Sequence, residues 1–342
     1  MLFVPIPFVV ALLLAILLAR MLVRADGPPA NRFFAASLGL YVALSILIGL
    51  RWGYGVRTLL PLQSLLAAAL PPLAFLGFRS VATEEPPSQP WLHAIPILLV
   101  LALMLLEPDF IDIALVATFF AYGVALLRLG LRGPDALRLA PLEEATTIHR
   151  ALLATAVALF VSAGLDTLIA TDMRLGDGSR GAIAVGLANL PVLLLLGAAM
   201  ALAGRSAPPT VPAETEAEPA VTESSAEEDR ETLAHVDALL RAGLTRDPDL
   251  NLGRLARRIG LPARRISGAI NRIEGRNVSQ YVNDRRIAEA VELLRTTDRP
   301  VTAILFEVGF STKSNFNREF RRVMGTSPLA WRTGEGGKGS GE

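Results

Sequence analysis

Two stretches near the C-terminus place basic and amide side chains on helices that have one apolar face. Apolar residues recur at i, i+4 and i+7 in both stretches, which predicts one buried helix face in each. The opposite faces carry arginine, which suits guanine in the major groove of DNA, and asparagine, which suits adenine. The apolar faces are Ile266, Ile270 and Ile273 in the first stretch and Phe316, Phe320 and Val323 in the second. The candidate DNA-contacting residues are Arg264, Arg265, Ser267, Asn271, Arg272, Thr312, Lys313, Ser314, Asn315, Asn317, Arg318, Arg321 and Arg322.

Each stretch follows a short apolar helix and a glycine turn. Asn251 is suited to cap the first short helix, and Gly260 supplies a left-handed residue after it. In the second copy Gly309 takes the turn position and Ser311 is the expected cap. One such helix is common in any helical bundle, and outward arginines are usually only solvated. Two copies with matched spacing favour a pair of helix-turn-helix units.

A helix between the two copies is predicted to hold them at a fixed separation. Asn277 and Gln280 have the spacing of a capping box. They open a helix whose apolar residues are Ile287, Val291 and Leu294. The two outward faces would then lie at a constant distance from each other.

At these residues the chain resembles the AraC/XylS family of bacterial transcription regulators. Residues 277–290, 306–310, 314–322 and 325–332 carry the resemblance, which covers the last third of the chain. The departures are Leu305, where the family has a small residue, and Gly268, where some members place a base-reading side chain. The resemblance implies a double helix-turn-helix fold with base contacts from Arg264, Arg265, Ser267, Lys313, Ser314, Asn317 and Arg318. Phosphate contacts are expected from Arg272, Asn315, Arg321 and Arg322.

The first 204 residues have a different composition. Hydrophobic residues make up 52% of the chain, and the excess lies before Ala207. Seven apolar segments approach the roughly 20 residues that cross a bilayer. They are 2–23, 33–50, 58–78, 91–106, 110–129, 151–170 and 182–203. Segment 91–106 is the weakest, because it is short and contains Pro96.

The distribution of arginine predicts the orientation of these spans. With the N-terminus outside, eight arginines lie in inner loops and four in outer loops. Seven spans then leave the C-terminus in the cytoplasm, where DNA is. The net charge of +1 is the sum of +7 from Arg230 onward and −6 before it. A basic C-terminal part agrees with a nucleic-acid partner.

The remaining boundaries follow from composition. Residues 205–229 are rich in proline and glutamate and are expected to form a disordered acidic linker. Residues 230–332 would be the DNA-binding domain, and the glycine-rich residues 333–342 a flexible tail. The chain has no cysteine, so it has no disulfide or thiolate metal site.

No catalytic constellation is visible. His93, His149 and His235 are scattered, so no metal site or cofactor is expected, and the chain is not predicted to be an enzyme. Glu143 and Glu144 are expected to lie in a solvated inner loop. One polar set in the outer halves of the spans suggests a ligand pocket, since ionisable groups at membrane depth are costly. Its members are Arg51, Trp52, Tyr54, Asp112, Asp166 and Asn189.

The sequence therefore predicts an all-α protein in which a seven-helix transmembrane sensor domain is joined to a double helix-turn-helix domain. The predicted function is that of a DNA-binding transcription regulator in the inner (cytoplasmic) membrane. The expected partners are double-stranded DNA, membrane lipid, a small-molecule or membrane signal, a second copy of the chain and RNA polymerase. A flexible tether transmits no rotation, so signalling is expected to act through dimerisation or access. Two alternatives stay open: a membrane-stored factor released by proteolysis in the linker, and a membrane transporter or enzyme with an appended regulator.

Overall fold

A computed structural model describes residues 5–23, 32–56, 58–83, 89–175 and 226–334. Within these ranges the fold is all-α, as the sequence predicts, and the regular elements are α-helices and short 3₁₀ turns. The chain divides into two compact units. The first comprises Met1–Ala136 and Thr147–Ala213, and the second comprises Leu137–Thr146 and Glu214–Glu342.

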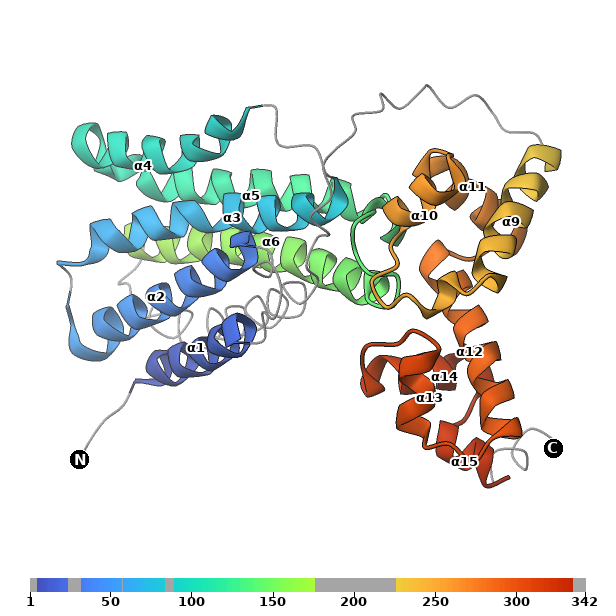
Figure 1. Ribbon diagram of the computed structural model, residues 1–342. Helices are drawn as coiled ribbons and strands as arrows, with labels where there is room; N and C mark the ends of the chain where they lie inside the picture. The colour runs from blue at the N-terminus through green and yellow to red at the C-terminus, as the bar shows by residue number, and fades with distance from the viewer. Residues whose placement is uncertain (1–4, 24–31, 57, 84–88, 176–225, 335–342) are drawn as a thin grey trace. The chain divides into compact units, whose positions relative to one another are not determined.

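The first unit is a bundle of apolar helices (Figure 1). Helix α1 packs on α2, α2 on α3, and α3 on both α4 and α5. Five helical segments are long and apolar enough to cross a membrane: Ile6–Val23, Arg32–Tyr54, Leu60–Ala82, Pro108–Gly130 and Ala145–Asp172. The helices of this unit are α1 (Ile6–Val23), α2 (Arg32–Tyr54), α3 (Leu60–Ala82), α4 (Ile95–Leu106), α5 (Ile111–Gly130) and α6 (Ala145–Leu175).

The two remaining predicted spans have different outcomes. The fourth is a 3₁₀ turn, η1 (Pro90–Ala94), followed by the 12-residue α4. It is shorter than the other apolar helices, because the segment ends at Glu107 and Pro108, where the turn η2 (Pro108–Phe110) begins. The seventh, 182–203, lies outside the described residues, as does the predicted linker up to residue 225.

Glycines let aromatic rings lie against neighbouring helices in the first unit. A Cβ added at Gly77 of α3 would lie 2.5 Å from the ring of Phe34 in α2. A Cβ at Gly123 of α5 would lie 3.0 Å from the ring of Phe160 in α6. Small residues at such contacts are typical of helices that associate by close packing in lipid.

The second unit holds two helix-turn-helix copies. The first is α10 (Leu252–Ile259) with α11 (Ala263–Glu274), and the second is α13 (Val301–Glu307) with α14 (Lys313–Met324). Helix α12 (Val278–Thr296) joins them. Helix α9 (Ala226–Arg241) and the 3₁₀ turn η5 (Leu244–Arg246) precede the first copy, and α15 (Pro328–Arg332) follows the second.

Caps and turns follow the sequence with one exception. The Asn251 side chain accepts a hydrogen bond from the Arg254 amide at 2.8 Å, and Asn277 forms the predicted capping box. Gly260 and Gly309 have φ values of 74° and 94°, as their turns require. The cap of α14 is Thr312 rather than Ser311, since the Thr312 hydroxyl accepts from the Asn315 amide.

Two apolar clusters form the core of the second unit, and α12 contributes to both. Val278, Tyr281 and Val282 pack in the first cluster with Ile266 and Ile270 of α11. The second cluster takes Ile287, Ala290 and Leu294 from α12 and packs them against Phe310, Phe316 and Phe320. The helix therefore fixes the positions of α11 and α14 relative to each other.

The predicted apolar faces are one residue too long at their C-terminal ends. Ile273 is 41% exposed and Val323 is 39% exposed, so both predictions of burial were wrong. Both residues lie in the last turn before a glycine C-cap, Gly275 or Gly325. The helix ends there, so the last apolar position of each face is left more than a third exposed.

Arg286 is a buried cation between the two copies. Its side chain is fully buried, and its Nε and Nη2 donate to the carbonyl oxygens of Thr245 and Asp247, each at 2.7 Å. The guanidinium carbon lies 5.5 Å from the centre of the Phe310 ring. Burial lowers the pKa of Arg286 to about 10, against the attraction of Glu143 and Asp247, so it keeps its charge at neutral pH.

We expect Arg286→Ala to destabilise the second unit by about 3–5 kcal/mol, since it removes two charge-assisted hydrogen bonds and leaves the carbonyl of the buried Thr245 without its guanidinium donor. Hydrogen exchange of the full chain in detergent should show faster exchange in α11, α12 and α14 together. Arg285→Ala is the matched control, because Arg285 is an exposed neighbour on the same helix and should cost under about 1 kcal/mol. Equal effects of the two substitutions would contradict the role given to Arg286.

Candidate nucleic-acid interface

The outer face of α11 carries three of the predicted residues in a row. Ile266, Ala269 and Ile270 are buried beneath it. The Ser267 hydroxyl donates to the Arg264 carbonyl at 3.2 Å. The side-chain amide of Asn271 donates to the Ser267 carbonyl at 2.9 Å. These side chains therefore lie along their own helix, on the face opposite the core.

Two arginines of α11 are held by acidic residues of α9. Arg272 makes two hydrogen bonds to the Asp229 carboxylate, at 2.5 and 2.6 Å, and these bonds raise the pKa of Arg272. Arg265 pairs with Glu228 at 3.3 Å. The sequence missed these pairs because residues 226–229 were predicted to belong to a disordered linker. They form the first turn of α9, and Asp229 is buried.

Helix α14 presents the second set. Lys313 and Ser314 are exposed in its first turn and Asn317 is partly exposed one turn later, with Phe316 and Phe320 buried on the opposite face. Asn315 is only 8% exposed, so its side chain lies against the domain rather than on the outer face. Thr312 uses its hydroxyl oxygen as the helix cap.

The three arginines of α14 have different surroundings. Arg318 Nε donates to Glu319 at 3.1 Å, and its Nη2 donates to the backbone carbonyl of Glu143 at 3.3 Å. Arg322 bridges Glu319, at 2.8 Å, and Asp284 of α12. Arg321 is exposed to solvent. Arg321 is therefore well placed to contact a phosphate, whereas Arg322 connects α14 to α12.

The prediction that Glu143 lies in a solvated loop was wrong. Glu143 is 1% exposed, and its segment Leu137–Thr146 belongs to the second unit. The apolar residues Leu137, Leu139, Ala140 and Leu142 are all buried as well. Their clustering around the two glutamates was the signal in the sequence, since a solvated loop has no need of four apolar residues.

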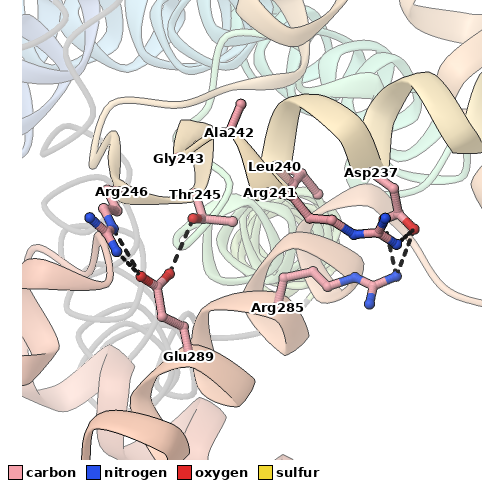
Figure 2. Close-up of a pocket in the computed structure, with 9 residues that line it drawn as sticks. All are labelled: Asp237, Leu240, Arg241, Ala242, Gly243, Thr245, Arg246, Arg285 and Glu289. Carbon is pink, nitrogen blue, oxygen red and sulfur yellow. Dashed lines mark hydrogen bonds and ion pairs between the residues drawn. The ribbon is translucent and has the colours of Figure 1, made fainter.

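A hollow of about 380 Å³ opens between α9, η5 and α12 (Figure 2). Its cations face carboxylates: Arg246 donates to Glu289 at 2.5 and 2.9 Å, and Arg285 donates to Asp237 at 3.0 and 3.1 Å. Arg241 also lies within 3.5 Å of Asp237. All three arginines are paired, with Arg241 and Arg285 sharing Asp237, so the hollow is a set of ion pairs rather than an anion site.

The ligand set predicted in the first unit is brought together only in part. Asp112 lies in the first turn of α5, and Asp166 lies in α6. The guanidinium carbon of Arg51 lies 5.1 Å from the centre of the Trp52 ring. The ring centres of Tyr54 and Phe8 are 6.0 Å apart. Asn189 lies outside the described residues. No group of three or more metal-ligating side chains gathers in the part of the chain that the structure describes.

Comparisons with known proteins agree with this arrangement. A family described as a helix-turn-helix domain matches residues 255–334, which include both copies except the start of α10. The transcriptional activator RhaS of Pectobacterium carotovorum is 31% identical over 84 residues, which are 25% of this chain and 30% of that protein. The regulatory protein SoxS of Salmonella typhimurium is 28% identical over 86 residues, which are 25% of this chain and 80% of that protein.

The arabinose operon regulatory protein of Escherichia coli is also similar, with 31% identity over 88 residues. The chain thus spans less than a third of the length of RhaS and of the arabinose regulator. No solved structure matches the chain significantly. The C-terminal unit therefore carries a helix-turn-helix domain of the AraC type, and each of these relatives aligns with about a quarter of the chain.

Replacing Arg322 should lower stability more than replacing Arg321. Arg322→Ala removes the donor shared by Glu319, a buried carboxylate, and Asp284, and should cost about 1–3 kcal/mol. Arg321→Ala, the same change one residue away, should stay within about 0.5 kcal/mol. The rate of hydrogen exchange in α14 of the full chain measures both effects. A larger loss of stability for Arg321→Ala than for Arg322→Ala would contradict the structural role given to Arg322.

Proposed function

We propose that this chain is a membrane-anchored transcription regulator that recognises DNA with α11 and α14. The observation that carries the proposal is the pair of helix-turn-helix copies held on one rigid helix, α12. Two recognition helices at a fixed separation suit two successive stretches of major groove. The printed names of RhaS, SoxS and the arabinose regulator support a role in transcription.

Exposure and pairing refine the roles of the predicted residues. We assign base-edge contacts to Arg264, Ser267, Lys313, Ser314, Asn317 and Arg318. Arg265 and Asn271 lie beside this set, and Thr312 is at the entry of α14. Arg321 is assigned to phosphate. Arg272, Arg322 and Asn315 would reach DNA only after leaving the contacts that the domain gives them.

The first unit is the proposed anchor and sensor in the inner membrane. Five helical segments have the length and hydropathy of spans. The arginine distribution favours an external N-terminus and a cytoplasmic C-terminal domain. The proposed partners are DNA, membrane lipid, a second copy of the chain, RNA polymerase and a signal at the spans. Release of the DNA-binding domain by proteolysis would instead put it in the soluble fraction on immunoblots.

DNA binding should depend strongly on salt and on Arg318. The full chain in lipid nanodiscs should bind a duplex enriched from a random-sequence pool, with affinity that falls steeply as salt rises. Arg318→Ala should cost about 1–3 kcal/mol on that duplex and less on random DNA. Arg321→Ala, the control, should weaken both duplexes alike. Fluorescence anisotropy measures these affinities, and equal losses on both duplexes for Arg318→Ala would reject its role in base recognition.

Reporter fusions test the orientation. A periplasmic alkaline phosphatase fused after Arg57 or Arg174 should be active, because both positions are predicted to lie outside. Fusions after Arg138 or Gly204 should be inactive. Comparable expression on immunoblots is the control. Activity after Gly204 would place the C-terminal domain on the wrong side of the membrane for DNA, and the proposed arrangement would fail.

A further inference from the structure

Leu137–Thr146 follows α5 in the sequence and ends with the first two residues of α6, yet it is part of the second unit. Leu142 is 3% exposed and belongs to the first apolar cluster of that unit, together with Leu250 and Leu252. A segment joining two proposed membrane spans therefore completes the core of the helix-turn-helix domain.

Backbone hydrogen bonds fix the segment at the start of α10. The Leu142 amide donates to the Leu250 carbonyl at 2.9 Å, and the Gly253 amide donates to the Arg138 carbonyl at 3.0 Å. Pro141 and Asn251 form a β-bridge between these two bonds. The Ser279 hydroxyl, at the start of α12, donates to the Leu142 carbonyl. The segment thus pairs along a stretch of backbone and is not held by one side chain alone.

Glu143 reaches from this position to the second copy. Its Oε2 accepts a hydrogen bond from the Ser311 amide at 2.8 Å, and its carbonyl accepts one from Arg318 at 3.3 Å. Ser311 stands directly before the cap of α14. One buried acidic residue therefore occupies both a backbone donor at the entry of the recognition helix and the guanidinium of Arg318.

These two contacts are made with groups that DNA would use. Backbone amides at the entry of a recognition helix commonly bind phosphate, and a carboxylate in that place holds the position of an anion. Arg318 cannot donate to the Glu143 carbonyl and lie in the plane of a base edge with the same Nη2. The negative charges of Glu143 and Glu144 also repel a phosphate backbone. Docking of the segment therefore excludes DNA contacts from the Ser311 amide and from this Nη2 of Arg318.

We propose that Leu137–Thr146 is an intramolecular inhibitor that blocks α14 until the segment leaves the domain. The inference rests on the proposed function, since it needs DNA as the competing ligand. Only molecules with an undocked segment are fully competent to bind DNA. The apparent Kd is therefore the intrinsic Kd divided by the undocked fraction. The segment is covalently continuous with α5 and α6, so a signal that moves the ends of these helices acts directly on it. The route does not pass through residues 205–225.

Glu143→Ala tests the inhibition in the full chain in nanodiscs, with the duplex enriched from a random-sequence pool as ligand. It removes the bond to Ser311 and should tighten DNA binding about 5- to 10-fold by fluorescence anisotropy. Glu144→Ala is the matched control, because it removes the same charge from the adjacent position, and it should change affinity less than about twofold. Unchanged or weaker binding by Glu143→Ala would overturn the proposal, with the segment then a scaffold for the domain.

A reversible cross-link gives a second test that does not depend on the loss of a contact. The chain has no cysteine of its own, so Glu143→Cys with Ser311→Cys can be bridged by a short thiol-reactive linker that reductant cleaves. The bridged protein should bind the duplex about tenfold more weakly than the same protein after reduction. Equal or tighter binding when bridged would overturn the inhibition alone. Failure of every variant to bind DNA at low salt would instead overturn the proposed function, and the inhibition with it.

Discussion

The buried guanidinium of Arg286 is the interaction on which the second unit depends. A charge without water must be satisfied by the groups around it, and here those groups come from both halves of the domain. Thr245 and Asp247 belong to the connection that precedes the first copy, and Phe310 belongs to the turn of the second. Gly309 reinforces the same junction, since any Cβ there would overlap the Thr245 carbonyl. The spacing of α11 and α14 follows from this packing.

A rigid pair of recognition helices has few ways of being regulated from within. A change in the shape of the domain would cost much free energy, so regulation has to act on access to its surface. Glu143 supplies a contact of this kind, because it lies against α14 and also attracts Arg286 electrostatically. The proposed dimerisation through the first unit is compatible with this contact, since raised local concentration and release of α14 would act on the same DNA equilibrium.

Much of this architecture was predictable from residues whose physics is local. Asn251, Asn277, Gly260 and Gly309 specify caps and turns within a few positions of themselves, and the apolar spacing specifies the buried faces. The candidate DNA-contacting face followed from the same periodicity. Pairings between distant segments were not predictable: Asp229 with Arg272, Asp284 with Arg322, and Glu143 with Ser311. Each joins residues more than 35 positions apart, and helical periodicity carries no information at that range.

In the proposed mode of binding, two recognition helices on one rigid support read two adjacent stretches of DNA. Hydroxyl-radical footprinting of the full chain on its enriched duplex tests it most directly, because the method reports backbone protection at single-nucleotide resolution. We expect two protected patches on one face of the duplex, about 10 base pairs apart, as two successive major grooves require. A single protected patch, or two on opposite faces, would contradict the account.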